Sequence, residues 1–203
     1  MIVKFDHISY SCAIFDEENT RQMFNDYEVE FHEIGLKNMS MKYKYMKEIQ
    51  EKHNIMLLTK ASNYPVEITA YDKCIAQKAT KYAVNDEWIE IYSCNPEQTA
   101  SFFSLLGMKK EEDGAMCIKP MLDERTLKIK IYETAKDNSN YLDQEGFGSL
   151  AFVVDNAKKQ RELFVNNGYE CSEIEELNVN GKRLKIFFTN SPTNEIIEFI
   201  GLR

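Results

Sequence analysis

The order of strand-like and helix-like segments repeats along this chain, and this repetition constrains the fold more than any single motif. An apolar strand-like run is followed by a helical stretch and then by further strand-like runs, and the order begins again twice. Three β-α-β-β-β units can be drawn, over residues 1–75, 84–135 and 147–202. Each unit buries its apolar face only by packing against another one. We therefore expect an α+β fold of repeated units, with curved half-barrel sheets and helices on their outer faces.

Helix signals are clearest in the second and third units. The stretch "NPEQTASFFSLLG" places Asn95 at an N-cap and Pro96 at the first helical position, and Gly107 follows the helix end. The stretch "AKKQRELFVNNGY" is closed by Gly168 in the same way. These signals predict one helix in each of the two units, directly after the first strand.

The first unit has two helical patterns. Residues 16–27 carry acidic side chains in their first turn, which favours a helix N-terminus. Residues 41–54 repeat apolar side chains every three to four positions, which predicts a second helix. We expect its lysines Lys42, Lys44 and Lys47 to lie on a solvated helix face, and the alternative is an anion site.

Strand signals include clean alternation in "TLKIKIYE" and a hairpin turn at Asn180-Gly181. Alternation of apolar and polar residues is typical of a strand with one buried face. An Asn-Gly pair between two such runs favours a two-residue hairpin turn. The third unit is therefore expected to contain an antiparallel pair around this turn.

Composition narrows the function classes. The chain has 203 residues, 43% apolar and 29% charged, which is typical of a globular protein with a sizeable core. Its net charge of −8 argues against nucleic-acid and membrane-surface partners. No apolar run approaches the ~20 residues of a membrane span, and "MIVKFDH" lacks the features of a signal peptide. Five widely spaced cysteines without a C-x-x-C favour reduced thiols and a cytoplasmic location.

These units resemble the vicinal oxygen chelate superfamily, which includes glyoxalase I, extradiol dioxygenases and bleomycin-resistance proteins. The third unit, from "GSLAFVVDNAKKQRELFVNNGYE" to "EIIEFIGL", is similar along nearly its full length. The second is similar through "WIEIYSCNPEQTASFFSLLGM", and the first at "FDHISYSC" and "PVEITAYD". The resemblance specifies the fold better than the chemistry, because one fold hosts isomerases, lyases, dioxygenases and binders.

The resemblance also implies metal-ligand positions, in the first and last strand of each unit. In the first unit these positions hold His7 and Glu67. Imidazole and carboxylate together suit Fe²⁺, Mn²⁺, Ni²⁺, Zn²⁺ or Co²⁺. The alternative is that His7 is a buried, hydrogen-bonded histidine and Glu67 a carboxylate at the rim.

The second unit offers Trp88 and Lys130 at these positions, and the third offers Ser149 and Glu198. This set cannot hold a transition metal. We expect the second and third units, which are adjacent, to pair into one domain over residues 84–203. That domain would bind an organic ligand with Trp88, Ser149 and Glu198, Trp88 stacking on the ligand. Trp88 could equally fill the core.

The first unit, residues 1–80, is then left without a partner inside the chain. A sheet with one open concave face normally finds a mate. We therefore expect a homodimer in which two copies of His7 and Glu67 form one metal site.

Two further residues are assigned to the first unit. His53 follows the second helical pattern, where it either caps the last carbonyls or lines the cavity as a catalytic acid or base beside Glu67. Tyr71 lies two period-2 steps from Glu67, which favours the same face of the strand and a ligand-binding role.

Two functions remain open. The first is a divalent-metal-dependent enzyme (a lyase, isomerase or dioxygenase) that acts on a small oxygen-rich metabolite. The second is a metal-free protein that binds or sequesters a small molecule, as bleomycin-resistance proteins do. The metal content of the purified protein distinguishes the two.

Overall fold

The computed structural model describes residues 1–13, 27–59, 64–76, 87–135, 140–179 and 181–202. The helix predicted over residues 16–27 lies outside these ranges, except for its last residue. The strands are β1 (Ile2–Cys12), β2 (Glu28–Lys37), β3 (Lys52–Thr59), β4 (Val66–Ala70), β5 (Ile89–Ser93), β6 (Lys109–Lys110), β7 (Met116–Ile118), β8 (Leu127–Glu133), β9 (Gly146–Val154), β10 (Glu175–Val179), β11 (Lys182–Asn190) and β12 (Ile196–Gly201). The helices are the 3₁₀-helix η1 (Ser40–Tyr45) and the α-helices α2 (Pro96–Leu105) and α3 (Ala157–Asn166).

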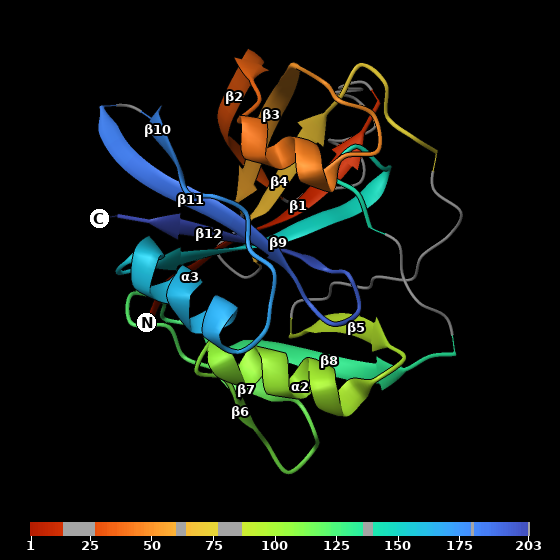
Figure 1. Cartoon of the computed structure of the whole chain (residues 1–203), viewed down its shortest axis with the longest axis vertical. Helices are drawn as coiled ribbons and strands as arrows, with labels where there is room; N and C mark the ends of the chain where they lie inside the picture. The colour runs from red at the N-terminus through yellow and green to blue at the C-terminus, as the bar shows by residue number, and fades with distance from the viewer. Residues whose placement is uncertain (14–26, 60–63, 77–86, 136–139, 180, 203) are drawn as a thin grey trace.

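The described strands form two sheets. Eight strands are ordered β10-β11-β12-β9-β1-β4-β3-β2, and four are ordered β5-β8-β7-β6. The first strands of the outer two units, β1 and β9, are antiparallel neighbours at the centre of the large sheet. Figure 1 shows the small sheet at the bottom, separate from the curved large sheet. This arrangement of mixed sheets and few helices confirms the predicted α+β class.

The large sheet therefore pairs the first unit with the third, whereas we expected the second to pair with the third. The strands of residues 89–93 and 146–154 lie in different sheets. Burial gives the physical reason. β1 and β9 bury side chains on both faces, whereas β5 and β8 alternate between buried and partly exposed residues. Strands with two apolar faces belong at the covered centre of a sheet.

This pairing changes two expectations that followed from the sequence. The two sheets do not correspond to the two expected domains, residues 1–80 and 84–203, because the first unit pairs with the third inside the chain. The homodimer was inferred from a first unit without such a partner, so that argument no longer applies. Dimerisation itself stays a prediction.

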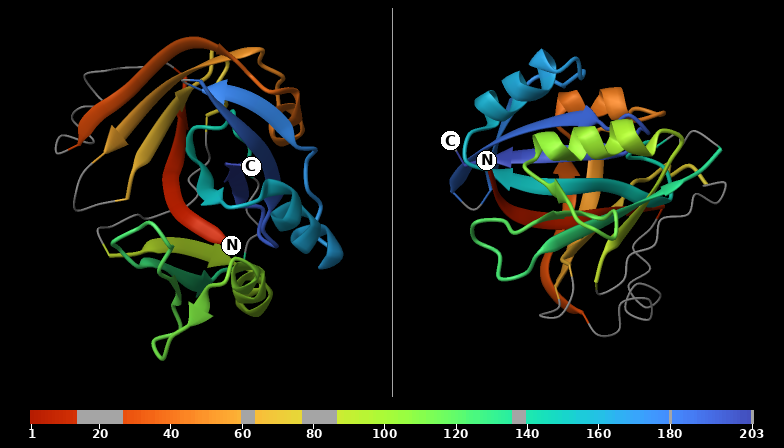
Figure 2. Two further views of the ribbon diagram at one scale, coloured as in Figure 1. Left: turned by 90° about the vertical axis from the view of Figure 1, so that its left-hand side faces the viewer. Right: turned by 90° about the horizontal axis from the view of Figure 1, so that it is seen from below.

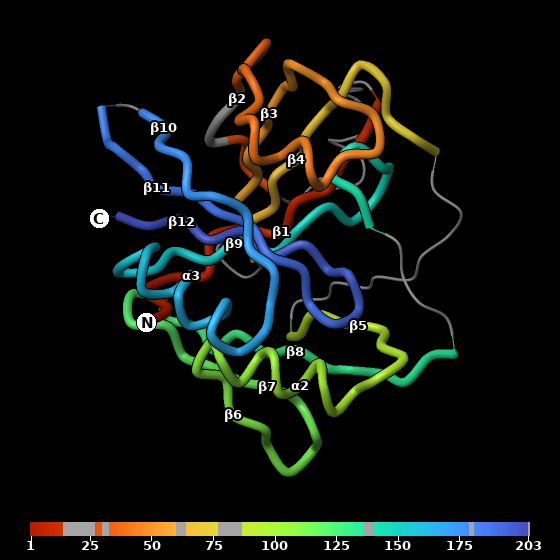
Figure 3. Tube along the Cα trace, in the orientation of Figure 1, coloured from red at the N-terminus to blue at the C-terminus, as the bar shows by residue number. Residues whose placement is uncertain are grey.

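The small sheet packs on the convex side of the large one through α2. Phe102 of α2 is fully buried, and its ring lies 5.1 Å from that of Phe164 on α3. Figure 3 traces these two helices next to one another. One apolar cluster contains Phe102, Ile89 of the small sheet and Phe199 of the large sheet. The two sheets thus share a core on this side.

Both α-helices begin at an asparagine cap, of which the sequence predicted the one at Asn95. The Asn95 side chain accepts a hydrogen bond from the Gln98 amide at 3.1 Å, and Asn156 accepts one from the Lys159 amide at 3.0 Å. Gly201 lets α3 approach β12 closely, because a Cβ there would lie 2.6 Å from that of Ala157. The predicted hairpin is also present, since β10 and β11 pair antiparallel on either side of residues 180–181.

The helix predicted over residues 41–54 is wrong for most of its length. Only η1 forms a helix there, and residues 52–59 are the strand β3. A 3₁₀-helix repeats every three residues, which places Met39, Lys42 and Tyr45 on one face. The Tyr45 hydroxyl donates to the Phe188 carbonyl at 2.9 Å, so η1 is fastened onto β11.

The large sheet is strongly curved, as Figure 2 (left) shows. Side chains from both of its ends, such as Leu36 of β2 and Leu177 of β10, line the same cavity. Among the described helices, none is both long and apolar enough to cross a bilayer.

Candidate functional site

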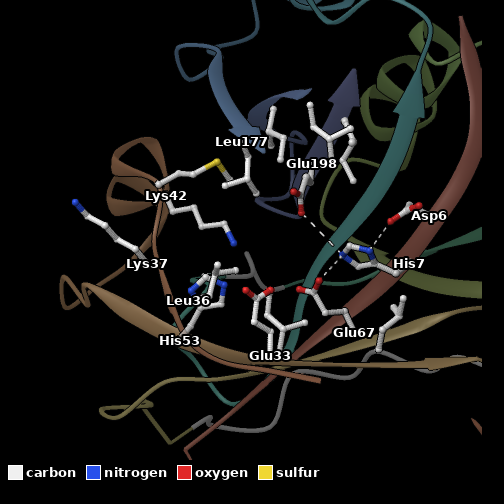
Figure 4. Close-up of a pocket in the computed structure, with 16 residues that line it drawn as sticks. Asp6, His7, Glu33, Leu36, Lys37, Lys42, His53, Glu67, Leu177 and Glu198 are labelled. Atoms are coloured by element: carbon white, nitrogen blue, oxygen red, sulfur yellow. Dashed lines mark hydrogen bonds and ion pairs between the residues drawn. The ribbon is translucent and has the colours of Figure 1, made fainter. Parts of the chain in front are cut away.

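The concave side of the large sheet contains a cavity of about 180 Å³. Figure 4 shows the side chains that line it. Much of its wall is aliphatic: Leu36, Ile55, Leu57, Leu184, Ile186 and Ile200. Charged and titratable side chains gather between these walls, from β1, β4, β12, β3 and η1. An apolar cavity with a few convergent polar groups is the usual form of a small-molecule site.

His7 lies at the centre of this group. Its side chain is 5% exposed, and its Nδ1 lies 3.0 Å from Asp6 Oδ2. Its Nε2 lies 3.6 Å from Glu67 Oε2 and 3.9 Å from Glu198 Oε2. Nε2 is buried and makes no hydrogen bond to any part of the chain that the structure describes. One ring nitrogen is thus fixed by a carboxylate, and the other faces two carboxylates without a direct bond.

The electrostatics follow from this arrangement. Burial disfavours the charged imidazolium, but Glu67, Asp6 and Glu198 outweigh it and raise the pKa of His7 to about 9. Burial also opposes ionisation of Asp6, yet the hydrogen bond from His7 lowers the pKa of that carboxyl. Burial raises the pKa of Glu198, with Glu67 adding to the effect and Lys42 and His7 opposing it. In the metal-free protein, a protonated His7 partly neutralises three carboxylates.

The register of the central strands accounts for this convergence. Ile8 pairs with Leu150 across β1 and β9, so an approximate twofold axis at this pair relates His7 to Ser149. On the flanking strands, Glu67 pairs with Ser9, and Glu198 pairs with the residue that the same axis relates to Ser9. The four positions implied for the first and third units therefore belong to one half-barrel.

Ser149 occupies the fourth position, but it is not among the cavity-lining residues and is 2% exposed. The described residues thus offer three donors: one imidazole and two carboxylates. This donor set suits a divalent transition metal. Metal-binding histidines typically donate the other ring N–H to a carboxylate, as His7 can to Asp6. As they stand, no three histidine, cysteine, aspartate or glutamate side chains of the described ranges are grouped to hold a metal.

His53 lines the same cavity from β3 rather than capping a helix. Burial and the nearby Lys42 lower its pKa to about 3, while the Leu36 backbone acts in the opposite direction. His53 is therefore neutral at neutral pH. Tyr71 does not line the cavity but lies behind it, fully buried, with its ring 5.9 Å from that of His53.

Trp88 does not line this cavity. It precedes β5 of the small sheet, where Lys130 Nζ lies 3.5 Å from the centre of its ring. Its indole Nε1 donates to Glu90 at 3.1 Å. The expected grouping of Trp88 with Ser149 and Glu198 fails because the second unit is in the other sheet.

Sequence reasoning missed Lys42, which we expected on a solvated face. Lys42 is 8% exposed and lines the cavity beside His53 and Glu198. The spacing of three from Met39 to Lys42 to Tyr45 was a signal for it, because it places the lysine on the apolar face of η1. Asp6 was missed as well. Neighbouring residues of a strand point to opposite faces, so the sequence did not predict the contact between the Asp6 carboxylate and the His7 ring.

No family model matches this sequence, and no curated protein matches it. Solved structures do resemble it in fold. A glyoxalase I mutant from Zea mays aligns over 98% of this chain and 67% of its own, with 11% identity and a TM-score of 0.39. A putative dioxygenase from Bacillus subtilis aligns over 100% and 66%, with 12% identity and a TM-score of 0.43. A methylmalonyl-CoA epimerase from Mycobacterium tuberculosis aligns over 98% and 88%, with 10% identity and a TM-score of 0.47. At this low identity, these likenesses concern the fold alone.

Proposed function

We propose that this protein is a divalent-metal-dependent enzyme that acts on a small oxygen-rich metabolite in the cavity of the large sheet. The observation that carries the proposal is His7 Nε2, which is buried, without a hydrogen bond in the described chain, and directed between two carboxylates at 3.6 and 3.9 Å. In this proposal His7, Glu67 and Glu198 hold the metal.

A metal held by these three residues would supply Lewis acidity, which stabilises negative charge on substrate oxygens. Asp6 orients the imidazole through Nδ1. The Thr69 hydroxyl donates to Glu67 Oε1 at 2.9 Å, which leaves Oε2 toward His7. The aliphatic walls exclude water from the reacting groups.

Glu67 remains our candidate for the catalytic carboxylate, because a lyase or isomerase of this kind needs a base for a proton next to a carbonyl. A base works best when its pKa lies near the working pH. The pKa of about 3 makes His53 a weak proton acceptor, so we assign it the role of a neutral wall of the cavity. The site is complete within one chain, and the proposal requires no second subunit.

The test is a calorimetric titration of metal-free protein with Mn²⁺, Ni²⁺, Co²⁺ and Zn²⁺ in turn. We expect one equivalent of at least one of these ions to bind to the wild type. The variant His7→Gln, which keeps the volume and a polar tip, should weaken binding by at least about 100-fold. Glu90→Gln on the small sheet is the matched control and should bind as the wild type does. Absence of binding by all four ions, or unchanged binding by His7→Gln, would contradict the proposal.

One observation favours a second function, a metal-free binding protein. The raised pKa of about 9 leaves His7 protonated at neutral pH in the metal-free protein. Together with the nearby ammonium of Lys42, it can offset much of the negative charge of Glu67 and Glu198 without a metal. The same titration decides between the two functions, because a metal-free binder keeps His7 charged and takes up no stoichiometric ion.

A further inference from the structure

Lys42 is a buried lysine that forms no ion pair with any residue of the described chain. It is 8% exposed and lines the cavity. Figure 4 shows its nitrogen directed into the space between His53, Glu198 and Glu67. Within the described ranges its ammonium has no hydrogen bond and no ion pair, and its one ring contact is with Phe188, 5.9 Å from the ring centre. Most buried lysines are paired, because an ammonium loses several kcal/mol of hydration on burial.

The backbone around Lys42 is held firmly, so its position is not that of a mobile surface side chain. The Glu175 carboxylate of β10 accepts hydrogen bonds from the Ser40 amide at 3.2 Å and the Met41 amide at 2.6 Å. It thereby caps the first turn of η1. At the other end, the Tyr45 hydroxyl bonds to β11. The fold thus fixes a cation opposite the carboxylate pair, across the cavity.

We infer that Lys42 binds the carboxylate of the substrate, and that the substrate is a small organic acid with an aliphatic tail. This inference rests on the proposed function of the same site, in which His7, Glu67 and Glu198 face the substrate oxygens. It adds the charge and the shape of the molecule. Lys42 is then a specificity-determining residue.

The charges around the cavity favour a singly charged carboxylate over a phosphate. One buried ammonium supplies a single point charge with three donors. Asp6, Glu67, Glu198 and Glu33 also line the cavity, and their carboxylates would repel a dianion. Lys37 lies at the exposed edge, where solvent screens it. The aliphatic side chains of β3, β11 and β12 that line the cavity would pack against the tail of the substrate.

The experiment compares an acid with its uncharged amide of the same shape. The probes are 2-hydroxy-4-methylpentanoate and 2-hydroxy-4-methylpentanamide, titrated by calorimetry into wild-type protein loaded with Mn²⁺. We expect the acid to bind about 10- to 100-fold more tightly than the amide, the range of a hydrogen bond between charged groups. Lys42→Met, which keeps the length of the side chain, should remove this preference and leave amide binding within about twofold.

Lys37→Met is the matched control, because it removes a lysine from the exposed edge of the same cavity. It should leave the preference for the acid within about twofold of the wild type. Thermal unfolding checks that Lys42→Met is folded, and Lys42→Gln replaces it if it is not. The inference is overturned if the wild type binds the acid no better than the amide or binds neither, or if the preference survives in the Lys42 variant.

The inference and the proposed function fail in different ways. If Mn²⁺ does not bind to the wild type, the metal-dependent function fails, and the same two probes are titrated into metal-free protein. A preference for the acid that Lys42→Met abolishes there still supports Lys42 as the carboxylate site. If Mn²⁺ binds equally to the wild type and Lys42→Met but neither prefers the acid, only the inference about Lys42 fails.

Discussion

The concave face of the large sheet and the outer face of the small sheet both carry charged and aromatic residues. The two faces differ in whether these residues are buried and in whether they bond to one another. On the small sheet, Glu90 accepts hydrogen bonds from Trp88 and from Tyr92, each at 3.1 Å, and Lys130 covers the indole ring. These side chains are partly exposed and satisfy one another. On the large sheet, His7 Nε2 is buried without a hydrogen bond, and the buried Lys42 side chain makes no ion pair, within the described chain. Polar groups left unmatched in a cavity indicate a ligand, whereas matched groups at a surface indicate a solvated face.

The largest effect should come from breaking the core that joins the two regions. Phe102→Ala removes a fully buried ring between α2 and α3, and should lower the free energy of unfolding by about 3–5 kcal/mol. Urea unfolding is followed by the fluorescence of Trp88, the only tryptophan, and by circular dichroism. Coincident transitions in the wild type would show that the sheets unfold together. Separate transitions would show that the small sheet is an independent unit.

The next effect concerns His53 and acid pH. Its pKa is about 3 in the folded protein and near 6.5, the ordinary value for histidine, when unfolded. Between these values only the unfolded chain binds the proton, so stability is full above pH 6.5 and falls as the pH drops toward 3. The loss attributable to His53 is at most roughly 5 kcal/mol.

His53→Leu should flatten this acid limb relative to the wild type, and urea unfolding at a series of pH values measures the difference. The comparison with the wild type removes the contribution of the surface carboxylates, which titrate in both proteins. Curves of identical slope between pH 6.5 and 3 would show that His53 is not buried as a neutral imidazole.

A third prediction separates the two faces by metal binding. Glu198→Gln should weaken binding of Mn²⁺, or of whichever ion binds best, by at least about 100-fold, because it removes an anionic ligand. Its metal-free form should unfold at no lower urea concentration, since burial already disfavours this carboxylate. Glu90→Gln makes the same glutamate-to-glutamine substitution on the small sheet and is the control. Equal effects of the two variants on metal affinity would remove the distinction between the faces.

The smallest effect should come from Lys130→Met on the small sheet. It removes a cation 3.5 Å from the centre of the Trp88 ring. At such a partly exposed position we expect a loss of about 0.5–1 kcal/mol and a changed Trp88 fluorescence. A loss of several kcal/mol, or an effect on metal or acid binding, would mean that this face participates in the site.

Local sequence signals predicted much of the secondary structure. The Asn95 cap forms as expected, because a cap depends on residues within one turn. The resemblance implied that His7 and Glu67 share a site, and His7 Nε2 lies 3.6 Å from Glu67 Oε2. It could not place Glu198 beside them, because that contact joins strands about 190 residues apart.

The alternation of β5 and β8 and the continuous burial of β9 held some information about which units pair. The expected pairing of the second and third units followed from their adjacency in the chain. Adjacency is a weaker guide to pairing than the number of faces that a strand must bury. Lys42 was misplaced for a related reason. Charge alone suggested solvent, whereas the cavity that receives its ammonium forms only when β1, β3 and β12 come together around η1.

The sequence by itself determined the α+β class, the repeated units and the positions of both α-helices, because these depend on periodicity and helix signals over short distances. The pairing of His7 with Glu67 was implied by the family resemblance. Only the tertiary structure decided that the first and third units form one half-barrel, that Trp88 lies outside it, and that Glu198 and Lys42 face His7. Those contacts arise from strands that bury both faces and therefore seek covered positions, wherever in the chain their partners lie.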